Sequence, residues 1–307
     1  MPSVSSIKPT ISVVVPVYNE RGTLEQLYTE VGAQLSALAR DHQFVFVDDG
    51  STDGSSDVLR GLAARDPRVT VVQFRMNRGK ADALNEGFRH ATGEVVFQMD
   101  ADLQDKPSEM PKMLEALGPV DMVSGWKRTR HDPLGKTLPS KFFNWVTAKV
   151  SGVALHDFNC GFKVYRREVL QEIDLYGEMH RFIPVIAARY GFKVAEQPVE
   201  HAPRVWGKSK YGFTRLFKGA YDLLTIMMIT RFETRPMHFF GTAGLGLGIL
   251  GFGILVYMSY LRLIEHAIIG NRPLLFLGIV LLLSGLQLGS AGLVGELLVR
   301  RTRGRDR

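Results

Sequence analysis

The stretch Val95-Val-Phe-Gln-Met-Asp-Ala-Asp-Leu-Gln-Asp105 decides the fold, because an apolar segment typical of a buried strand runs directly into acidic residues. Asp100 and Asp102 are one residue apart, with Gln104 just behind them. Oxygen donors spaced in this way can converge on one Mg²⁺ or Mn²⁺ ion, which would share diphosphate oxygens as further ligands. Taken alone, so short a motif more often marks a solvated acidic turn, so its neighbours in the sequence decide between the two interpretations.

Strand-like and helix-like segments alternate around this motif. The predicted strands cover 11–16, 44–47, 69–74 and 95–99, and the predicted helices cover 23–40, 57–65 and 80–90. This alternation predicts an α/β fold with a mostly parallel sheet and helices on both faces. Ligands of such sheets bind beyond the carboxyl ends of the strands, where each polar cluster of this sequence lies.

Two further clusters follow the first two predicted strands, Pro16-Val-Tyr-Asn-Glu20 and Asp48-Asp-Gly-Ser-Thr-Asp53. A carboxylate at a strand tip can accept hydrogen bonds from a nucleobase or a ribose, and the Tyr18 ring can stack on a base. Asp49 is the better candidate in the second cluster, because 51–53 is at least as readily a turn and helix N-cap. Dinucleotide-binding and P-loop proteins are disfavoured, since neither GxGxxG nor a Walker A sequence is present.

Lys80 opens the helix predicted after Asn77-Arg-Gly. A lysine at a helix N-terminus would face a phosphate or a nucleotide. The alternative is an ordinary solvated lysine.

Two C-terminal segments are apolar enough to cross a membrane. Residues 239–261 carry no charge, and 273–294 have only Gln287 as a strongly polar side chain. Each is long enough to span the hydrocarbon layer as a helix, although a pair of buried soluble helices is the alternative. The short connection between them predicts a hairpin with both ends on one side.

Arginines indicate the orientation of this hairpin. They precede the first span and are dense after the second, whereas the loop 262–272 has few cations and contains Glu265. The positive-inside rule therefore places the N-terminal domain and the tail in the cytoplasm. The net charge of +7 agrees, because juxtamembrane cations are attracted to anionic headgroups, and no nucleic-acid recognition motif accompanies it. A single cysteine, Cys160, suits a reducing compartment.

Four ordered motifs carry a resemblance to a known family. VVVPVYNE (13–20), VDDGSTDGS (47–55), NRGKADALNEGF (77–88) and QMDADLQD (98–105) together resemble the nucleotide-sugar-binding half of a glycosyltransferase family 2 enzyme of GT-A fold. Three later segments, 159–167, 177–184 and 204–211, resemble polyprenyl-phosphate glycosyltransferases, the group that contains dolichol-phosphate mannose synthases and bactoprenol glucosyltransferases. The hairpin is similar to the bacterial bactoprenol glucosyltransferase and aminoarabinose transferase branch.

The resemblance implies three parts in a multi-pass protein of the cytoplasmic membrane. Residues 1–210 would form a cytoplasmic GT-A domain with a Rossmann-like, mostly parallel sheet, and 236–307 a hairpin with spans at about 239–261 and 273–295 and a basic cytoplasmic tail. Residues 211–235 would form amphipathic helices on the membrane surface, with a core helix of the soluble domain as the alternative.

The resemblance also implies a role for each site residue. The nucleotide-sugar would contact Pro16, Tyr18, Glu20, Asp49, Lys80, Asp100 and Asp102. Mg²⁺ or Mn²⁺ would be held by Asp100, Asp102 and Gln104. Phosphate and acceptor contacts would come from Arg128, Arg181, Arg204, Ser209 and Lys210, and the catalytic residues would be Asp102, Asp157 and Arg204. The segment 125–130 departs from the family pattern, so it stays open whether Lys127, Arg128 or Arg130 meets phosphate.

The implied reaction is inverting transfer of a sugar from a nucleotide-sugar to undecaprenyl or another polyprenyl phosphate, for modification of a cell-envelope glycan. UDP-glucose is the first candidate donor, and UDP-N-acetylglucosamine, UDP-aminoarabinose and GDP-mannose stay open. A phosphate monoester with a second pKa of about 6 is already largely ionised at neutral pH, so a general base is dispensable. Asp157 is the candidate if one is used, and a structural carboxylate otherwise.

Three other possibilities follow from the sequence. A processive polysaccharide synthase would need a Gln-x-x-Arg-Trp motif and more spans than this chain has. A non-catalytic nucleotide-sugar sensor would be expected if Asp100 and Asp102 were eroded, and both are present. The glycines between 241 and 248 could pack spans together in a homo-oligomer, or reflect ordinary glycine enrichment: Gly241, Gly244, Gly246 and Gly248.

Overall fold

The chain divides into two compact units, Met1–Leu223 and Leu224–Arg307. The computed structural model describes residues 10–38, 40–128, 134–202, 221, 224–225, 227–228, 232, 235–266, 268 and 272–303, with backbone only for 134–142 and 302–303. Most of the predicted surface helices at 211–235 therefore lie outside the described residues, as do Arg204, Ser209 and Lys210. The division of the chain proposed from the sequence, including its boundary at 210, remains a prediction.

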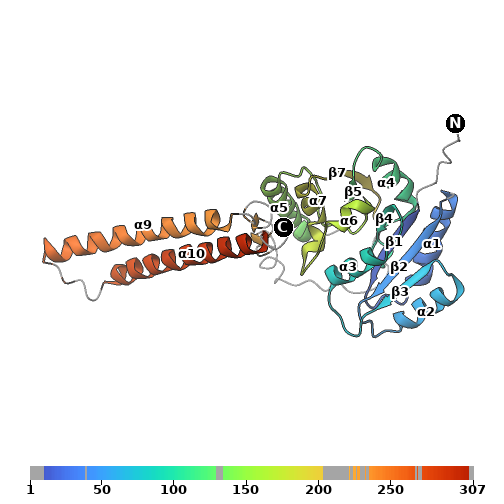
Figure 1. Ribbon diagram of the computed structural model, residues 1–307, viewed down its shortest axis with the longest axis horizontal. Coiled ribbons are helices and arrows are strands. Elements are labelled where there is room, and N and C mark those ends of the chain that lie inside the picture. Colours follow the sequence, from blue (N-terminus) through green and yellow to red (C-terminus); the bar gives the residue numbers. More distant parts are fainter. Residues whose placement is uncertain are drawn as a thin grey trace. The chain divides into compact units, whose positions relative to one another are not determined.

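The first unit is an α/β domain built on one seven-stranded sheet, as the sequence predicts (Figure 1). Its first half contains β1 Ile11–Val17, α1 Leu24–Ala37, β2 His42–Asp48, α2 Ser55–Arg65, β3 Val69–Gln73, α3 Lys80–His90 and β4 Val95–Gln98. Its second half contains a 3₁₀ turn Pro107–Glu109, α4 Met110–Ala116, β5 Met122–Lys127, α5 Leu134–Ser151, β6 Lys163–Arg166, α6 Arg167–Gln171, a 3₁₀ turn Met179–Arg181, α7 Ile183–Arg189 and β7 Val194–Val199.

The strand order β3-β2-β1-β4-β6-β5-β7 explains where the helices lie. The chain moves outward from β1 to β3 and then returns to β4, and right-handed crossovers put helices from opposite directions on opposite faces. Accordingly α1 and α2 cover one face of the sheet and α3 covers the other (Figure 1). The reversal between β1 and β4 is the switch point at which open α/β sheets bind ligands.

The second half of the sheet contains a strand that runs the other way. β6 pairs antiparallel with both β4 and β5, whereas the remaining pairs are parallel. The pairing brings Lys163, the first residue of β6, opposite Gln98, the last residue of β4. A lysine is thereby delivered to the strand end that carries the acidic motif.

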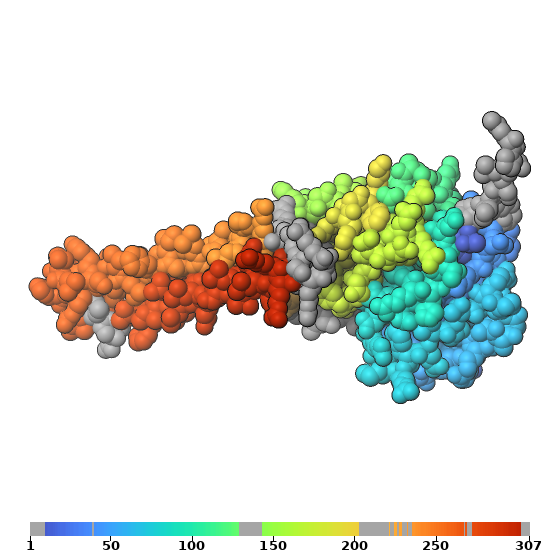
Figure 2. Space-filling model, in the orientation of Figure 1, coloured from blue at the N-terminus to red at the C-terminus, as the bar shows by residue number. Residues whose placement is uncertain are grey.

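The two halves of this unit are joined across α3. The Asn85 side-chain amide donates to the carbonyl oxygen of Leu175 at 2.6 Å, and its oxygen accepts from the Leu175 amide at 3.0 Å. In the space-filling view the surface of the α3 region, in cyan, runs without a break into the yellow-green surface of the later segment (Figure 2). These bonds fix α3, and with it Lys80, against the second half of the sheet.

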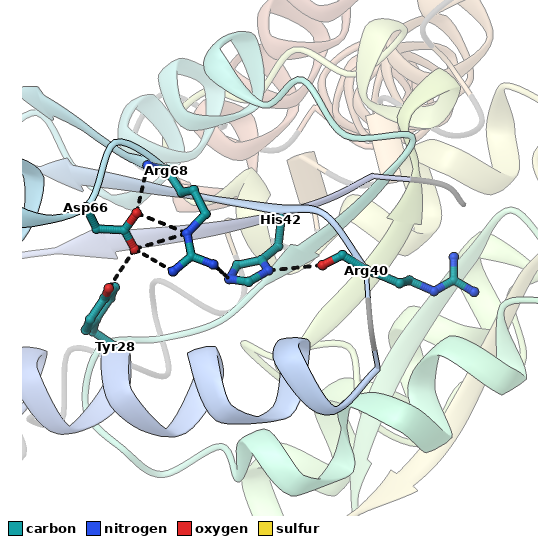
Figure 3. A network of polar contacts seen from close by, with 5 residues as sticks. All are labelled: Tyr28, Arg40, His42, Asp66 and Arg68. Carbon is teal, nitrogen blue, oxygen red and sulfur yellow. Dashed lines mark hydrogen bonds and ion pairs between the residues drawn. The ribbon is translucent and has the colours of Figure 1, made fainter. Parts of the chain in front are cut away.

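A polar network lies at the amino-terminal ends of β2 and β3, opposite the strand ends that form the site (Figure 3). Asp66 is buried and accepts from the Tyr28 hydroxyl at 2.6 Å and from the Arg68 guanidinium at 2.9 Å. His42 lies 2.9 Å from Arg68 through Nε2 and 3.1 Å from the Arg40 carbonyl oxygen through Nδ1. Because a carbonyl only accepts, Nδ1 carries the proton and Nε2 accepts from Arg68.

We expect Asp66→Asn to destabilise the protein by about 1–3 kcal/mol, because the change leaves Arg68 without its buried ionic partner. Hydrogen bonds from Arg68 lower the pKa of Asp66, outweighing the effect of burial. A lowered carboxyl pKa stabilises the fold fully above roughly pH 4, and this contribution is lost as the pH falls further toward the lowered value. The measurement is the thermal midpoint of the full-length solubilised protein at pH 7 and below pH 4.

The matched control is Asp57→Asn, which breaks an ion pair with Arg60 at the surface, where the Asp57 side chain is 75% exposed. Exposed pairs contribute between 0 and about 1 kcal/mol, so its midpoint should barely move. Equal thermal midpoints for Asp66→Asn and the native protein at pH 7 would show that the ion pair between Asp66 and Arg68 does not stabilise the fold.

The second unit contains two long apolar helices, α9 Pro236–Leu263 and α10 Pro273–Arg303, which run side by side as a hairpin (Figure 1). By length and composition both can cross a membrane. Glycines allow the close approach, since a Cβ on Gly244 would lie 2.6 Å from the Gly285 carbonyl oxygen and one on Gly251 would lie 2.7 Å from that of Gly278. Gly246 faces open space, so the glycine-rich face predicted from the sequence is divided between this contact and the outside.

Candidate functional site

A cavity of about 240 Å³ lies at the switch point between β1 and β4. Its wall comes from the turns that follow β1, β2 and β4 and from the start of α3. It is lined by Pro16, Val17, Tyr18, Glu20, Asp49, Asn77, Gly79, Lys80, Ala83, Asp100, Ala101 and Asp102. All seven residues that the sequence assigned to a nucleotide-sugar are therefore brought together at one cavity. Their individual contacts with a donor remain a prediction.

Asp49 binds the backbone just before the first residue of α3. It is buried, and its two oxygens accept hydrogen bonds from the backbone amides of Arg78 at 2.6 Å and Gly79 at 3.0 Å. Burial raises the pKa of Asp49, and the two amide bonds offset part of that rise. The carboxylate thus holds the residues immediately before Lys80, so its contribution to the site includes the position of that lysine.

The turns after β1 and β2 are tied together. The Asn19 side-chain oxygen accepts from the Thr52 amide at 2.8 Å, and the Glu20 amide donates to the Ser55 hydroxyl at 3.1 Å. Asp53 accepts from the Ser55 amide at 3.0 Å in the turn before α2. The N-cap of α2 is Gly54, without a side-chain hydrogen bond, so the helix N-cap considered for 51–53 lies one residue later. Tyr18 remains 39% exposed at the wall of the cavity.

Lys80 and Asp100 form an ion pair in the floor of the cavity, with Nζ 2.5 Å from Oδ1. Burial alone would raise the pKa of Asp100, but Lys80 and two further lysines outweigh it and lower the pKa to about 2. Asp100 is therefore ionised at neutral pH. Next to it, Asp102 is nearly buried and its Oδ1 accepts from the Gln104 amide at 3.2 Å, which makes a tight turn of the acidic motif.

The donor set of this turn suits a hard divalent cation. Asp100, Asp102 and Gln104 offer carboxylate and amide oxygens, which Mg²⁺ and Mn²⁺ prefer. Over the described part of the chain, however, no group of three or more His, Cys, Asp or Glu residues is arranged to hold a metal. An ion at Asp102 would therefore need diphosphate oxygens and water as further ligands, as is usual for Mg²⁺ beside phosphates.

The turn before β6 packs closely against Asp100. A Cβ at Gly161 would lie 2.3 Å from Asp100 Oδ2, so only glycine leaves room for that carboxylate. Asp157 is buried at the start of this turn and accepts from the Asn159 amide at 3.1 Å. Burial raises the pKa of Cys160 to about 12, so this thiol is un-ionised and inert.

A buried lysine and a partly buried histidine lie near Asp100. Lys163 is 1% exposed and donates to the Cys160 carbonyl oxygen, and burial lowers its pKa to about 8. Burial also lowers the pKa of His180 to about 3, with help from Lys80, so this imidazole is neutral. Sequence patterns did not single out Lys163, because nothing in its neighbourhood predicted an antiparallel strand beside β4.

The structure describes only some of the predicted phosphate-binding residues. Arg128 is exposed just after β5 and Arg181 pairs with Glu178 at 2.9 Å, and neither lines the cavity. Lys127 is partly buried, with Nζ 3.6 Å from Asp105 Oδ1, so it turns toward the interior of the domain. Arg204, Ser209 and Lys210 lie outside the described residues, and so does Arg130.

Known proteins resemble this chain over most of its length. Residues 12–174 match the family described as Glycosyl transferase family 2. A dodecaprenyl-phosphate galacturonate synthase of Rhizobium johnstonii is 37% identical over 94% of this chain and 88% of the relative. An undecaprenyl-phosphate 4-deoxy-4-formamido-L-arabinose transferase of Pseudomonas paraeruginosa is 35% identical over 94% and 85% of the two chains.

Solved structures share the fold at lower identity. A mannosyltransferase from Pyrobaculum calidifontis, in complex with GDP-Man and Mn²⁺, has a TM-score of 0.50 at 22% identity over 92% of this chain and 88% of its own. A glucosyl-3-phosphoglycerate synthase from Mycobacterium tuberculosis, in complex with Mn²⁺, uridine diphosphate and phosphoglyceric acid, has a TM-score of 0.55 at 20% identity over 72% and 78%. The chain belongs to glycosyl transferase family 2 and is a glycosyltransferase with a GT-A-like domain followed by an apolar helical hairpin.

Proposed function

We propose that this protein transfers a sugar from a nucleoside diphosphate donor to a polyprenyl phosphate, with inversion at the anomeric carbon. The observation that carries the proposal is the cavity at the switch point, where Tyr18, Asp49, Lys80 and the acidic turn converge. The acceptor class is supported by the relatives described above, which are named for transfer to dodecaprenyl and undecaprenyl phosphate. Their similarity covers nearly the whole chain.

The sugar itself is a separate question. One relative is named for galacturonate and another for a formamido-arabinose, so neither name supports the glucose that the sequence suggested first. We keep the UDP-linked donor that the sequence suggested first, with galacturonate and the arabinose derivative tested beside glucose.

The cavity residues would bind the donor in two parts. Tyr18 would stack on the base and Glu20 would accept from the ribose hydroxyls. Both lie in the turn after β1, which hydrogen bonds join to the turn after β2. Lys80 lies at the first position of α3, so its ammonium can pass from Asp100 to a diphosphate oxygen when the donor arrives. Asp100, Asp102 and Gln104 would hold Mg²⁺ or Mn²⁺, which when bound neutralises the charge that develops on the departing diphosphate.

The acceptor needs little activation. A polyprenyl phosphate is largely dianionic at neutral pH, so one of its oxygens can attack the anomeric carbon directly. Asp157 would then serve to orient the turn 157–161 rather than to remove a proton, which agrees with its hydrogen bond to the Asn159 amide. Arg128, Arg181, Arg204 and Lys210 would offset the repulsion between the lipid phosphate and the donor diphosphate, and the Ser209 hydroxyl would donate to a phosphate oxygen. A single displacement gives a β-linked product from an α-linked donor.

The proposed orientation places the catalytic domain and the C-terminal tail on the cytoplasmic side of the membrane. Arginines flank the outer ends of α9 and α10, including Arg235, Arg300 and Arg301, in agreement with the positive-inside rule.

The test is transfer of labelled sugar into undecaprenyl phosphate by the purified full-length protein. We expect organic-extractable label from one member of a panel of UDP-galacturonate, UDP-4-deoxy-4-formamido-L-arabinose, UDP-glucose, UDP-N-acetylglucosamine and GDP-mannose. The label should depend on Mn²⁺ or Mg²⁺, and the anomeric coupling in the NMR spectrum should show inversion. Donor hydrolysis without a lipid product from any member would overturn the proposed acceptor.

A further inference from the structure

Three residue pairs join the acidic turn to the end of β7. The Ala202 amide donates to the Gln104 carbonyl oxygen at 2.9 Å, Asp105 and His201 form an antiparallel bridge, and Lys106 Nζ lies 2.7 Å from Glu200 Oε2. The pairs follow one another in antiparallel register. The turn that carries Asp102 and Gln104 is therefore fixed to the chain that leaves the last strand of the sheet.

The Asp105 carboxylate lies at the centre of this junction. Its side chain is 2% exposed, and its Oδ1 is 3.6 Å from both Lys127 Nζ and His201 Nδ1. Neither carboxylate oxygen has a hydrogen-bond partner among the residues that the structure describes, and the same holds for His201 Nδ1. Hydrogen bonds between such groups are normally 2.7–3.2 Å long, so the three side chains face one another just beyond bonding distance.

A purely structural ion pair does not account for this geometry. A buried carboxylate is costly unless it is fully hydrogen-bonded, and an apolar side chain of similar volume would fill the space at lower cost. Nearby carboxylates, with Asp105 foremost, outweigh the burial of Lys127 and raise its pKa, so the lysine stays charged. A buried polar group without a hydrogen-bond partner in the protein calls for an explanation.

The position of Asp105 supplies one. Lys127 is the last residue of β5, which leads into Arg128, and His201 follows β7, where the chain continues toward Arg204. Both arginines are predicted phosphate-binding residues, although Arg204 lies outside the described residues. The Asp105 carboxylate thus connects the acidic turn with the ends of β5 and β7, from which the chain continues toward the predicted acceptor-binding arginines.

We infer that Asp105 is a positioning residue. It holds the ends of β5 and β7, which lead to the predicted acceptor-binding residues Arg128 and Arg204, in place relative to the acidic turn of the donor site. This inference rests on the proposed function. UDP in the cavity contacts the acidic turn, and Asp105 passes a shift of that turn to Lys127 and His201 at the ends of β5 and β7.

The test compares Asp105→Asn with the native full-length protein in three measurements. We expect the KM for undecaprenyl phosphate to rise roughly tenfold, within the range of coupling between residues of one network, while the Kd for UDP with Mn²⁺ stays within about twofold. In hydrogen–deuterium exchange, UDP with Mn²⁺ should slow the amides of residues 199–202 in the native protein and leave them unchanged in the variant. His201→Gln should reproduce both effects and serves if the first variant does not fold.

The control is Glu200→Gln, which removes the neighbouring pair of the same ladder, where the two side chains are 44% and 68% exposed. It should leave KM and exchange as in the native protein. A loss of UDP affinity with an unchanged acceptor KM would overturn the inference, because Asp105 would then serve only the donor turn. If the native protein transfers nothing to polyprenyl phosphate, the proposed function fails, but the exchange experiment still decides whether Asp105 carries the coupling.

Discussion

We expect Asp102→Asn to lower kcat for sugar transfer by roughly 10³-fold, the equivalent of the several kcal/mol that a divalent cation contributes at a departing phosphate. The carboxylate lies in the wall of the cavity at the tip of the acidic turn, where the diphosphate of the donor is proposed to bind. Asparagine keeps the shape of the side chain and one oxygen but removes the negative charge. The loss should therefore fall on the chemical step and on cation affinity.

The fold should survive this change. Asp102 Oδ1 accepts from the Gln104 amide at 3.2 Å, and the amide oxygen of asparagine can accept the same bond. The thermal midpoint should shift by no more than that of Asp57→Asn, the exposed control in α2. Besides kcat, the binding of Mn²⁺ in the presence of UDP should weaken at least roughly tenfold when measured by the electron paramagnetic resonance of free Mn²⁺. Activity within tenfold of the native protein would show that Asp102 is not a metal ligand.

The sequence predicted the first half of the domain well because local patterns there agree with the global fold. Buried apolar runs alternate with amphipathic helices, and the polar clusters directly follow the strands, so parallel pairing alone brings Tyr18, Asp49 and Asp100 together. The boundaries differ by only a few residues. The helix predicted to reach Arg40 ends at Ala37, and the strand predicted to begin at Phe44 begins at His42.

The second half was less accessible to sequence reasoning. β6 is four residues long and runs antiparallel between two strands that are distant in the sequence, so no local pattern of apolar and polar residues predicts it. The consequences of that pairing, such as the buried Lys163 beside Gln98, depend on contacts between distant segments. The same is true of Asp105, whose partners Lys127 and His201 come from the ends of two other strands. The sequence showed these charges but not that they meet.

We expect Gly161→Ala to lower kcat/KM by roughly 10²-fold, the cost of moving a site residue by about an ångström. The added Cβ would lie 2.3 Å from Asp100 Oδ2 and 2.6 Å from its Cγ, distances that no side chain tolerates. Asp100 is short and is held by Lys80 at 2.5 Å, so it cannot swing aside without breaking the ion pair. The substitution should therefore act on donor binding and transfer, with a loss of stability of about 1–3 kcal/mol from overpacking.

A glycine in open space provides the control. Gly61 lies within α2 with nothing near its Cβ position, so Gly61→Ala should stabilise the helix by about 0.5–1 kcal/mol and leave transfer unchanged. The decisive comparison is the double variant with Asp100→Ala. If Gly161→Ala acts by displacing the Asp100 carboxylate, then it should cost little further activity once that carboxylate is gone, because two changes on one contact are not additive. Losses that multiply independently would show instead that Gly161 is required by the backbone of its own turn.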